Sequence, residues 1–195
     1  IISYADWKEL PLGSCGRIVP HMEIKIDSPD PENIVGEIMV RGANVMLGYY
    51  KNPEATAAVI DSDGWFHTGD LGILDADGFL YIRGRSKNML LGSSGQNIYP
   101  EEIEDKLNTL PYVSESIVIQ KGEKLYGLVY PDFEEAQKDG LDDEMLAAQM
   151  EQNRKELNSI VNNYEQLSGI KIFQEEFEKT PKRSIKRFLY ADAEI

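Results

Sequence analysis

The stretch that decides the fold of the first part of the chain is Leu71-Gly-Ile-Leu-Asp-Ala-Asp-Gly-Phe-Leu-Tyr-Ile-Arg83. Its two apolar ends, Leu71–Leu74 and Phe79–Arg83, have the composition of strands. Between them, Asp75-Ala-Asp-Gly78 is typical of a turn in which glycine supplies a positive φ. The stretch therefore predicts a β-hairpin.

Toward the N-terminus the sequence continues as short strands separated by turns. Residues Ile18–Ile26 alternate between apolar and polar side chains, and Gly36–Arg41 forms a second short strand pattern. Asn52 followed by Pro53 is typical of a capped helix start, which predicts a short helix through Ile60. These patterns indicate a small β-rich unit.

Toward the C-terminus helices enter the pattern. The predicted elements are a helix from Pro100 to about Leu110, strands over Val113–Gln120 and Lys124–Tyr130, a long helix from Asp142 to Leu167 and a strand over Ile170–Phe173. Such a mixture indicates a second, α+β unit, and the polar junction near Arg85–Lys87 is the expected boundary.

The long predicted helix carries an apolar stripe with approximate heptad spacing. Its members are Leu146, Met150, Leu157, Ile160, Tyr164 and Leu167, interrupted by Asn153. A stripe of this length on one helix favours contact with the unit's own core over a dimerising coiled coil. The alternative, a helix that serves as a partner surface, stays open at this point.

Composition excludes several classes of protein. The 195 residues include 34 acidic and 20 basic side chains, for a formal charge of −14. This charge argues against binding to nucleic acid or docking on an anionic membrane. One Cys and two His cannot form an internal disulfide or an ordinary zinc site. Without an apolar run of membrane-spanning length or a signal peptide, we expect a cytoplasmic protein. Because the chain begins at Ile1, we also expect it to belong to a longer protein.

A local basic cluster stands out in this acidic chain. Lys179–Arg187 contains five basic residues and no acidic one. Such a cluster can hold an anion, and its alternative is a solvated tail that balances nearby acids. Within it, Lys186 could project from a turn and stabilise negative charge that develops between a carboxylate and a phosphate.

Two further positions have side chains suited to a ligand with hydroxyl groups. Asp70 follows Gly69, where the backbone can turn tightly, and its carboxylate can accept hydrogens from both hydroxyls of a ribose diol. The alternative role is a strand-end cap. Arg85 follows Gly84 and could contact hydroxyls or phosphate, or form a surface ion pair. We expect His67 to be a packing or hydrogen-bonding residue.

The loop Leu91-Gly-Ser-Ser-Gly-Gln-Asn97 allows close approach of the backbone to a ligand, although it lacks the spacing of a P-loop. A plain turn is the alternative. The sequence contains no metal-ligand cluster, and we expect no metal ligands in this chain.

Four motifs in order resemble the adenylate-forming, or AMP-binding, enzymes, and among them the long-chain fatty acyl-CoA synthetases. They are Gly64-Trp-Phe-His-Thr-Gly-Asp-Leu-Gly72, Asp77-Gly-Phe-Leu-Tyr-Ile-Arg-Gly-Arg85, Gly95-Gln-Asn-Ile-Tyr-Pro-Glu-Glu-Ile-Glu104 and Lys179-Thr-Pro-Lys-Arg-Ser-Ile-Lys186. The resemblance implies that residues 1–85 are the end of the large N-terminal domain, a β-barrel-like subdomain. Residues 86–195 would be the mobile α+β C-terminal domain that carries the catalytic lysine.

The resemblance also implies roles for individual residues. Asp70 and Arg85 would contact the ribose hydroxyls of ATP and of the acyl-adenylate, and Lys87 would be the hinge between the domains. The loop around Gly95 would turn toward the active site for thioester formation, and Lys186 would bridge carboxylate and phosphate during adenylation. One departure is Ile185, because the family commonly has glycine before this lysine.

The implied activity is that of an ATP-dependent fatty acid–CoA ligase with ATP, Mg²⁺ and coenzyme A. The ion would be bound mainly by the upstream domain, and the isolated 195 residues are expected to be inactive. Alternatives are a ligase that loads an acyl carrier protein and a non-catalytic interaction module. The expected partners are a fatty acid and coenzyme A, with no nucleic acid and no transmembrane segment. Peripheral membrane contact, acyl chain length and oligomeric state stay open.

Overall fold

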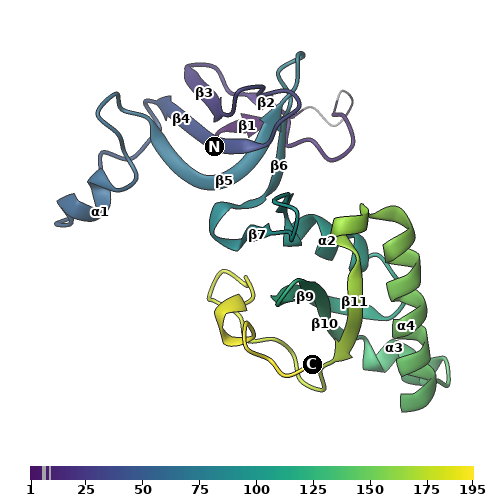
Figure 1. Ribbon diagram of the computed structural model, residues 1–195. Helices are drawn as coiled ribbons and strands as arrows, with labels where there is room; N and C mark the ends of the chain where they lie inside the picture. The colour runs from purple at the N-terminus through teal and green to yellow at the C-terminus, as the bar shows by residue number, and fades with distance from the viewer. Residues whose placement is uncertain (6–7, 9) are drawn as a thin grey trace. The chain divides into compact units, whose positions relative to one another are not determined.

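The computed structural model describes residues 1–5, 8 and 10–195, which form two compact units (Figure 1). The first unit is Ile1–Asn88 and the second is Met89–Ile195. The predicted mixed α+β class is confirmed, because a β-rich unit is followed by one that combines a sheet with helices. The assignment of separate functions to residues 1–85 and 86–195 stays a prediction.

The first unit is built on an antiparallel sheet of four strands in the order β3-β4-β5-β6. The strands are β3 (Met22–Asp27), β4 (Gly36–Gly42), β5 (Phe66–Leu74) and β6 (Leu80–Arg85), and β1 (Ser3–Tyr4) pairs with β2 (Arg17–Ile18) in a separate ribbon. The predicted hairpin is confirmed as β5 and β6. Its turn is closed by the Asp75 carboxylate, which accepts a 2.8 Å hydrogen bond from the backbone N–H of Phe79.

The sheet buries one apolar cluster, formed by Ile26, Ile38, Val40 and Leu80. Two expectations for this unit are wrong. The described strands form an open sheet and no closed barrel, with β3 and β6 at its edges. The single strand predicted over Ile18–Ile26 is split into β2 and β3, because the chain turns at His21, whose φ is 65°.

Helix α1 (Pro53–Ala57) is shorter than the prediction, which extended it to Ile60. Its start is as expected, since the Asn52 side chain accepts a 3.0 Å hydrogen bond from the N–H of Ala55. Ile60 lies beyond the end of the helix and forms an isolated β-bridge with Phe66 of β5, while its N–H donates to the carbonyl of Thr56 at 2.9 Å.

The second unit contains a sheet of three strands in the order β11-β10-β9. Its elements are β7 (Leu90–Leu91), β8 (Asn97–Ile98), α2 (Pro100–Leu107), β9 (Val113–Lys121), β10 (Lys124–Pro131), α3 (Phe133–Lys138), α4 (Asp143–Ile160), β11 (Leu167–Ile172) and the short 3-10 helices η2 (Asn163–Glu165) and η3 (Arg187–Leu189). Strand β9 is antiparallel to β10, and β11 is parallel to it.

Each face of this sheet has its own core. Helices α2 and α4 cover one face, where Ile103, Leu107 and Leu157 are fully buried (Figure 1). The C-terminal segment after β11 covers the other face, and Phe177 packs there against Ile117 and Leu128. Full burial of a side chain of this size is worth about 1.5–3 kcal/mol, so the C-terminal segment is a folded part of the unit.

The long helix predicted from Asp142 to Leu167 ends at Ile160, because Leu167 begins β11 and is buried in the core. The preceding short helix α3 was not predicted. Leu146, Met150 and Leu157 of α4 are buried in the unit's own core, whereas the stripe members Ile160 and Tyr164 are exposed. The part of the stripe before Ile160 therefore packs in the core, as the sequence favoured. Among the described residues, no helix combines the length and apolarity that crossing a bilayer requires.

Candidate functional site

In the first unit the structure brings Asp70 and Arg85 together on neighbouring strands. They are directly opposite each other in the β5–β6 register, and Arg85 Nε lies 2.8 Å from Asp70 Oδ1. The Asp70 side chain is 29% exposed and that of Arg85 is 52% exposed. The pair is therefore open to a ligand. Arg85 can hold the Asp70 carboxylate in place while the remaining acceptor positions of that carboxylate stay available.

The backbone before Asp70 is irregular, because the register between β4 and β5 shifts there. Gly69 has a φ of +71°, a conformation that glycine adopts without the strain of a side chain. The N–H of Asp70 donates a 3.0 Å hydrogen bond to Thr68 Oγ1, and Thr68 Oγ1 donates to the carbonyl of Ile38 at 2.7 Å. In place of a tight turn, Gly69 thus lies at an irregularity of the β4–β5 register, and a hydrogen bond from Thr68 to β4 holds it.

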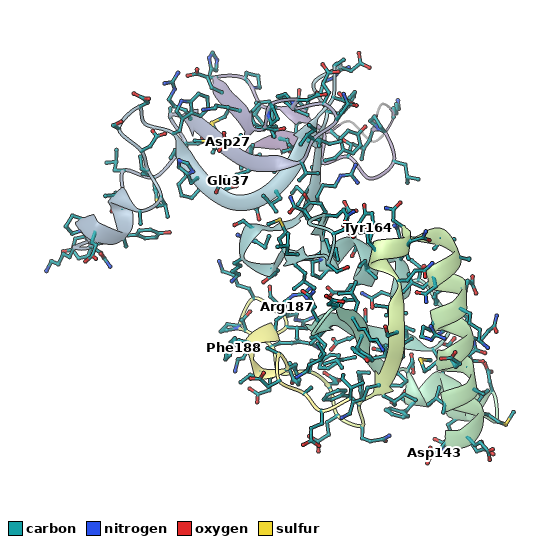
Figure 2. The ribbon with its side chains drawn as sticks, viewed as in Figure 1. Asp27, Glu37, Asp143, Tyr164, Arg187 and Phe188 are labelled. Carbon is teal, nitrogen blue, oxygen red and sulfur yellow. The ribbon has the colours of Figure 1, made fainter. Side chains whose placement is uncertain are left out.

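Glu37 is a supporting residue that sequence reasoning missed. Glu37 lies on β4 (Figure 2). Its Oε1 accepts a 2.9 Å hydrogen bond from the N–H of Gly69, and its Oε2 lies 2.9 Å from His67 Nδ1. His67 is therefore the hydrogen-bonding residue that the sequence suggested. Nothing near Glu37 in the sequence indicates this role, because its partners are 30 and 32 residues away.

Partial burial changes the electrostatics of Asp70. Burial raises the pKa of the Asp70 carboxyl, Arg85 opposes this shift, and the nearby Glu37 adds to it. A carboxylate that has lost part of its hydration gains more from hydrogen-bond donors than one in bulk water. The site therefore favours a ligand that brings hydroxyl donors.

Lys87 lies in the 3-10 helix η1 (Ser86–Asn88), which directly follows β6 and ends the first unit. Its side chain is exposed. The position is compatible with a hinge, because few backbone hydrogen bonds constrain a single 3-10 turn.

In the second unit, Gly95 lies at an open turn between β7 and β8. Its N–H donates to the carbonyl of Gly92 at 2.9 Å, and its φ is +83°. Among the described residues, apart from Gly95 and its two chain neighbours, no heavy atom lies within 4 Å of the position that a Cβ would occupy at Gly95. Ile98 anchors the hairpin in the core and α2 begins at Pro100, so the turn is an exposed tip on a fixed base.

The basic cluster forms a second turn. The N–H of Thr180 donates to the carbonyl of Ser184 at 2.8 Å, and Arg183 has a φ of 63°. Lys182 and Arg183 occupy the exposed tip. Lys186 lies on the returning segment, where its N–H donates to the carbonyl of Glu178 at 2.8 Å and its Nζ lies 2.9 Å from Glu178 Oε2. We expected Lys186 to project from the turn. It lies instead at the base of the turn, next to Glu178.

Carboxylates neutralise most of this cluster. Lys179 pairs with Glu115 and Glu176, Lys186 with Glu178, and Arg187 with Glu104 and Glu101. Within the part of the chain that the structure describes, no ion pair is found for Lys182 or Arg183. The cluster is therefore a set of specific ion pairs around two exposed cations.

Among residues 1–5, 8 and 10–195, no group of three or more His, Cys, Asp or Glu side chains could hold a metal ion.

Comparison with known proteins gives consistent matches along the chain. Residues 1–50 match the family model described as AMP-binding enzyme, and residues 87–192 match the model for the AMP-binding enzyme C-terminal domain. The chain is 39% identical over 155 residues to the probable acyl-activating enzyme 10 of Arabidopsis thaliana. The aligned region covers 80% of this chain and 28% of that protein.

Two further relatives differ in the acid that their names give. The long-chain-fatty-acid–CoA ligase FadD15 of Mycobacterium tuberculosis is 30% identical over 98% of this chain and 34% of its own length. The O-succinylbenzoate coenzyme A synthetase MenE of Bacillus subtilis, solved in complex with AMP, has a TM-score of 0.74 and 27% identity, over 94% of this chain and 36% of that chain. The chain thus spans about a third of these proteins.

Proposed function

Because this chain belongs to the AMP-binding enzyme family, we propose that it is the C-terminal part of an ATP-dependent acid–CoA ligase, and that the acid is a fatty acid. The match with FadD15 over 98% of the chain supports the choice of acid. The observation that carries the proposal is the Asp70–Arg85 pair, a partly buried carboxylate held in place beside a strand irregularity that Glu37 braces.

The proposed reaction has two steps. An oxygen of the fatty carboxylate forms a bond to the α-phosphorus of ATP, and the bond to the leaving pyrophosphate breaks. The thiol of coenzyme A then attacks the acyl carbon of the adenylate, loses its proton and releases AMP. The residues of this chain bind and orient these reactants; Mg²⁺ would be bound elsewhere in the full-length protein.

Each candidate residue has a role in this proposal. Asp70 accepts hydrogen bonds from the ribose hydroxyls, and Arg85 fixes the carboxylate and offers its own N–H donors to the sugar. Lys186 can leave Glu178, because that carboxylate is 63% exposed and exposed ion pairs are weak. Its ammonium then neutralises charge between carboxylate and phosphate. The Gly95 turn contacts the reactants during thioester formation.

The proposal is tested with the full-length protein and a panel of acids that includes fatty acids of several lengths, indoleacetate and succinylbenzoate. We expect ATP–pyrophosphate exchange that depends on a fatty acid, and a CoA thioester detected by mass spectrometry. Exchange with aromatic acids alone would contradict the fatty acid assignment. Transfer to a phosphopantetheinylated carrier protein and not to coenzyme A would favour the carrier-protein alternative. Absence of exchange with every acid would overturn the proposal.

A Lys87→Pro substitution tests the hinge. Proline is tolerated in the first turn of a helix but fixes φ, so the fold should persist while rotation about φ of residue 87 is lost. We expect the half-reaction that requires the other domain orientation to slow by roughly tenfold or more, a barrier increase of about 1.4 kcal/mol. Lys87→Ala, which keeps the backbone free, is the control. Unchanged rates of both half-reactions in Lys87→Pro would exclude a hinge at this residue.

A further inference from the structure

A bidentate ion pair joins the C-terminal segment to helix α2 of the same unit. Arg187 Nη1 donates to Glu104 Oε1 at 2.6 Å, and Nη2 donates to Glu104 Oε2. Glu101 Oε1 lies 3.8 Å from the same Nη2. Figure 2 labels Arg187 beside Phe188 on the C-terminal segment. The Arg187 side chain is 25% exposed while Phe188 is 75% exposed, so the guanidinium is the inward-facing group of the two.

Glu104 is the buried centre of this contact. The residue is only 5% exposed, and Oε1 also accepts a 2.6 Å hydrogen bond from the backbone N–H of Val118 on β9. Burial raises the pKa of the Glu104 carboxyl, and Arg187 opposes that shift. One carboxylate thus joins α2, β9 and the C-terminal segment.

The pair lies next to both segments that the proposed reaction uses. Arg187 directly follows Lys186, whose own partner Glu178 is exposed and holds it weakly. On the other side, α2 begins at Pro100, two residues after β8 of the Gly95 hairpin. Arg187 therefore joins the segment that carries Lys186 to α2.

Stability alone is a poor explanation for this pair. Replacing a buried ion pair with apolar side chains of similar volume is often neutral or stabilising, whereas removal of one partner is strongly destabilising. We propose that Glu104 and Arg187 are positioning residues that fix the turn bearing Lys186 against α2 in the geometry needed for adenylation. This inference rests on the proposed function.

The test compares single and double substitutions in the full-length protein. Arg187→Met and Glu104→Met are each expected to lower the melting temperature of this unit by roughly 10 °C, because each leaves a buried group without its partner. The double substitution should recover part of that loss, because it removes the unpaired charge but leaves the backbone N–H of Val118 without its acceptor. We expect its adenylation rate to stay down by about tenfold to a hundredfold, the effect of misplacing a catalytic group by about 1 Å.

Two further measurements separate positioning from folding. The double variant should convert supplied acyl-adenylate to the CoA thioester at a near wild-type rate. Arg187→Lys keeps the charge and loses the bidentate geometry, so it should fold and still lose adenylation. Arg154→Met is the control, because it breaks an ion pair with Glu151 on α4 and should leave adenylation unchanged.

The outcomes distinguish this inference from the proposed function. If the double variant recovers adenylation together with stability, or if Arg187→Lys adenylates like the wild type, the pair is structural only and the inference is overturned. If the wild-type full-length protein does not catalyse adenylation with any acid, the proposed function itself fails.

Discussion

Replacing Lys186 with Met in the full-length protein is expected to lower the rate of acyl-adenylate formation by about 10²–10³-fold, the usual cost of removing one group that stabilises transition-state charge. Methionine keeps the length and the apolar stem of the side chain, so the substitution removes little besides the ammonium. Because Lys186 pairs with an exposed carboxylate, its loss should leave the melting temperature nearly unchanged. The rate is measured by pyrophosphate release in single-turnover conditions.

The second half-reaction provides the internal control. Thioester formation from supplied acyl-adenylate does not include the step in which charge develops on the α-phosphate. The Lys186→Met variant should therefore form the thioester at a rate close to that of the wild type. Equal loss of both half-reactions would contradict the assigned role, because it would indicate a general defect in binding or folding.

Lys182→Met is the matched control within the same turn. Lys182 lies at the exposed tip, where the structure gives it no ion pair among the described residues, whereas Lys186 lies at the base beside Glu178. We expect Lys182→Met to adenylate at close to the wild-type rate. If Lys182→Met loses adenylation and Lys186→Met does not, the cation that serves the reaction is at the tip of the turn and the assignment of Lys186 is wrong.

The sequence predicted the parts of the fold that depend on neighbouring residues. The β5–β6 hairpin is specified by the turn chemistry of Asp75 and Gly78, and the start of α1 by Asn52 and Pro53. The C-terminal end of α4 was not predictable from such local patterns. Its apolar spacing continues past Ile160, but Leu167 is taken up by parallel pairing with β10, a contact between segments about forty residues apart.

The same limit applies to the candidate site. Asp70 and Arg85 were recognised from their own motifs, and the register of β5 and β6 brings them together. Glu37 and Glu104 were missed as supporting residues because their partners come from other strands and from the end of the chain. Glu104 lies inside a motif that the sequence singled out, yet only burial against β9 shows why a carboxylate occupies that position.

Asp70→Asn is the second substitution for which we expect a large effect. The amide keeps the size of the side chain, but it replaces one acceptor oxygen with a donor and removes the charge that two ribose hydroxyls would use. Hydrogen bonds to charged groups contribute about 1.5–3 kcal/mol each, so kcat/KM for ATP should fall by about 10²-fold, mostly through a higher KM. Unlike Lys186→Met, this variant should impair both half-reactions, because the adenylate carries the same ribose.

Asp70→Asn should weaken nucleotide binding and leave the stability of the fold nearly unchanged. Arg85, which is half-exposed, can find water when its partner is neutral, so the melting temperature should change little. Asp77→Asn is the control. Asp77 is exposed and lies in the turn at the far end of the same hairpin, and its substitution by Asn removes an equal charge. Equal losses in kcat/KM for the two variants would show that overall charge matters and not a contact with the ribose. A normal KM for ATP in Asp70→Asn would instead identify Asp70 as a structural partner of Arg85, held in place by the irregular segment that Glu37 braces.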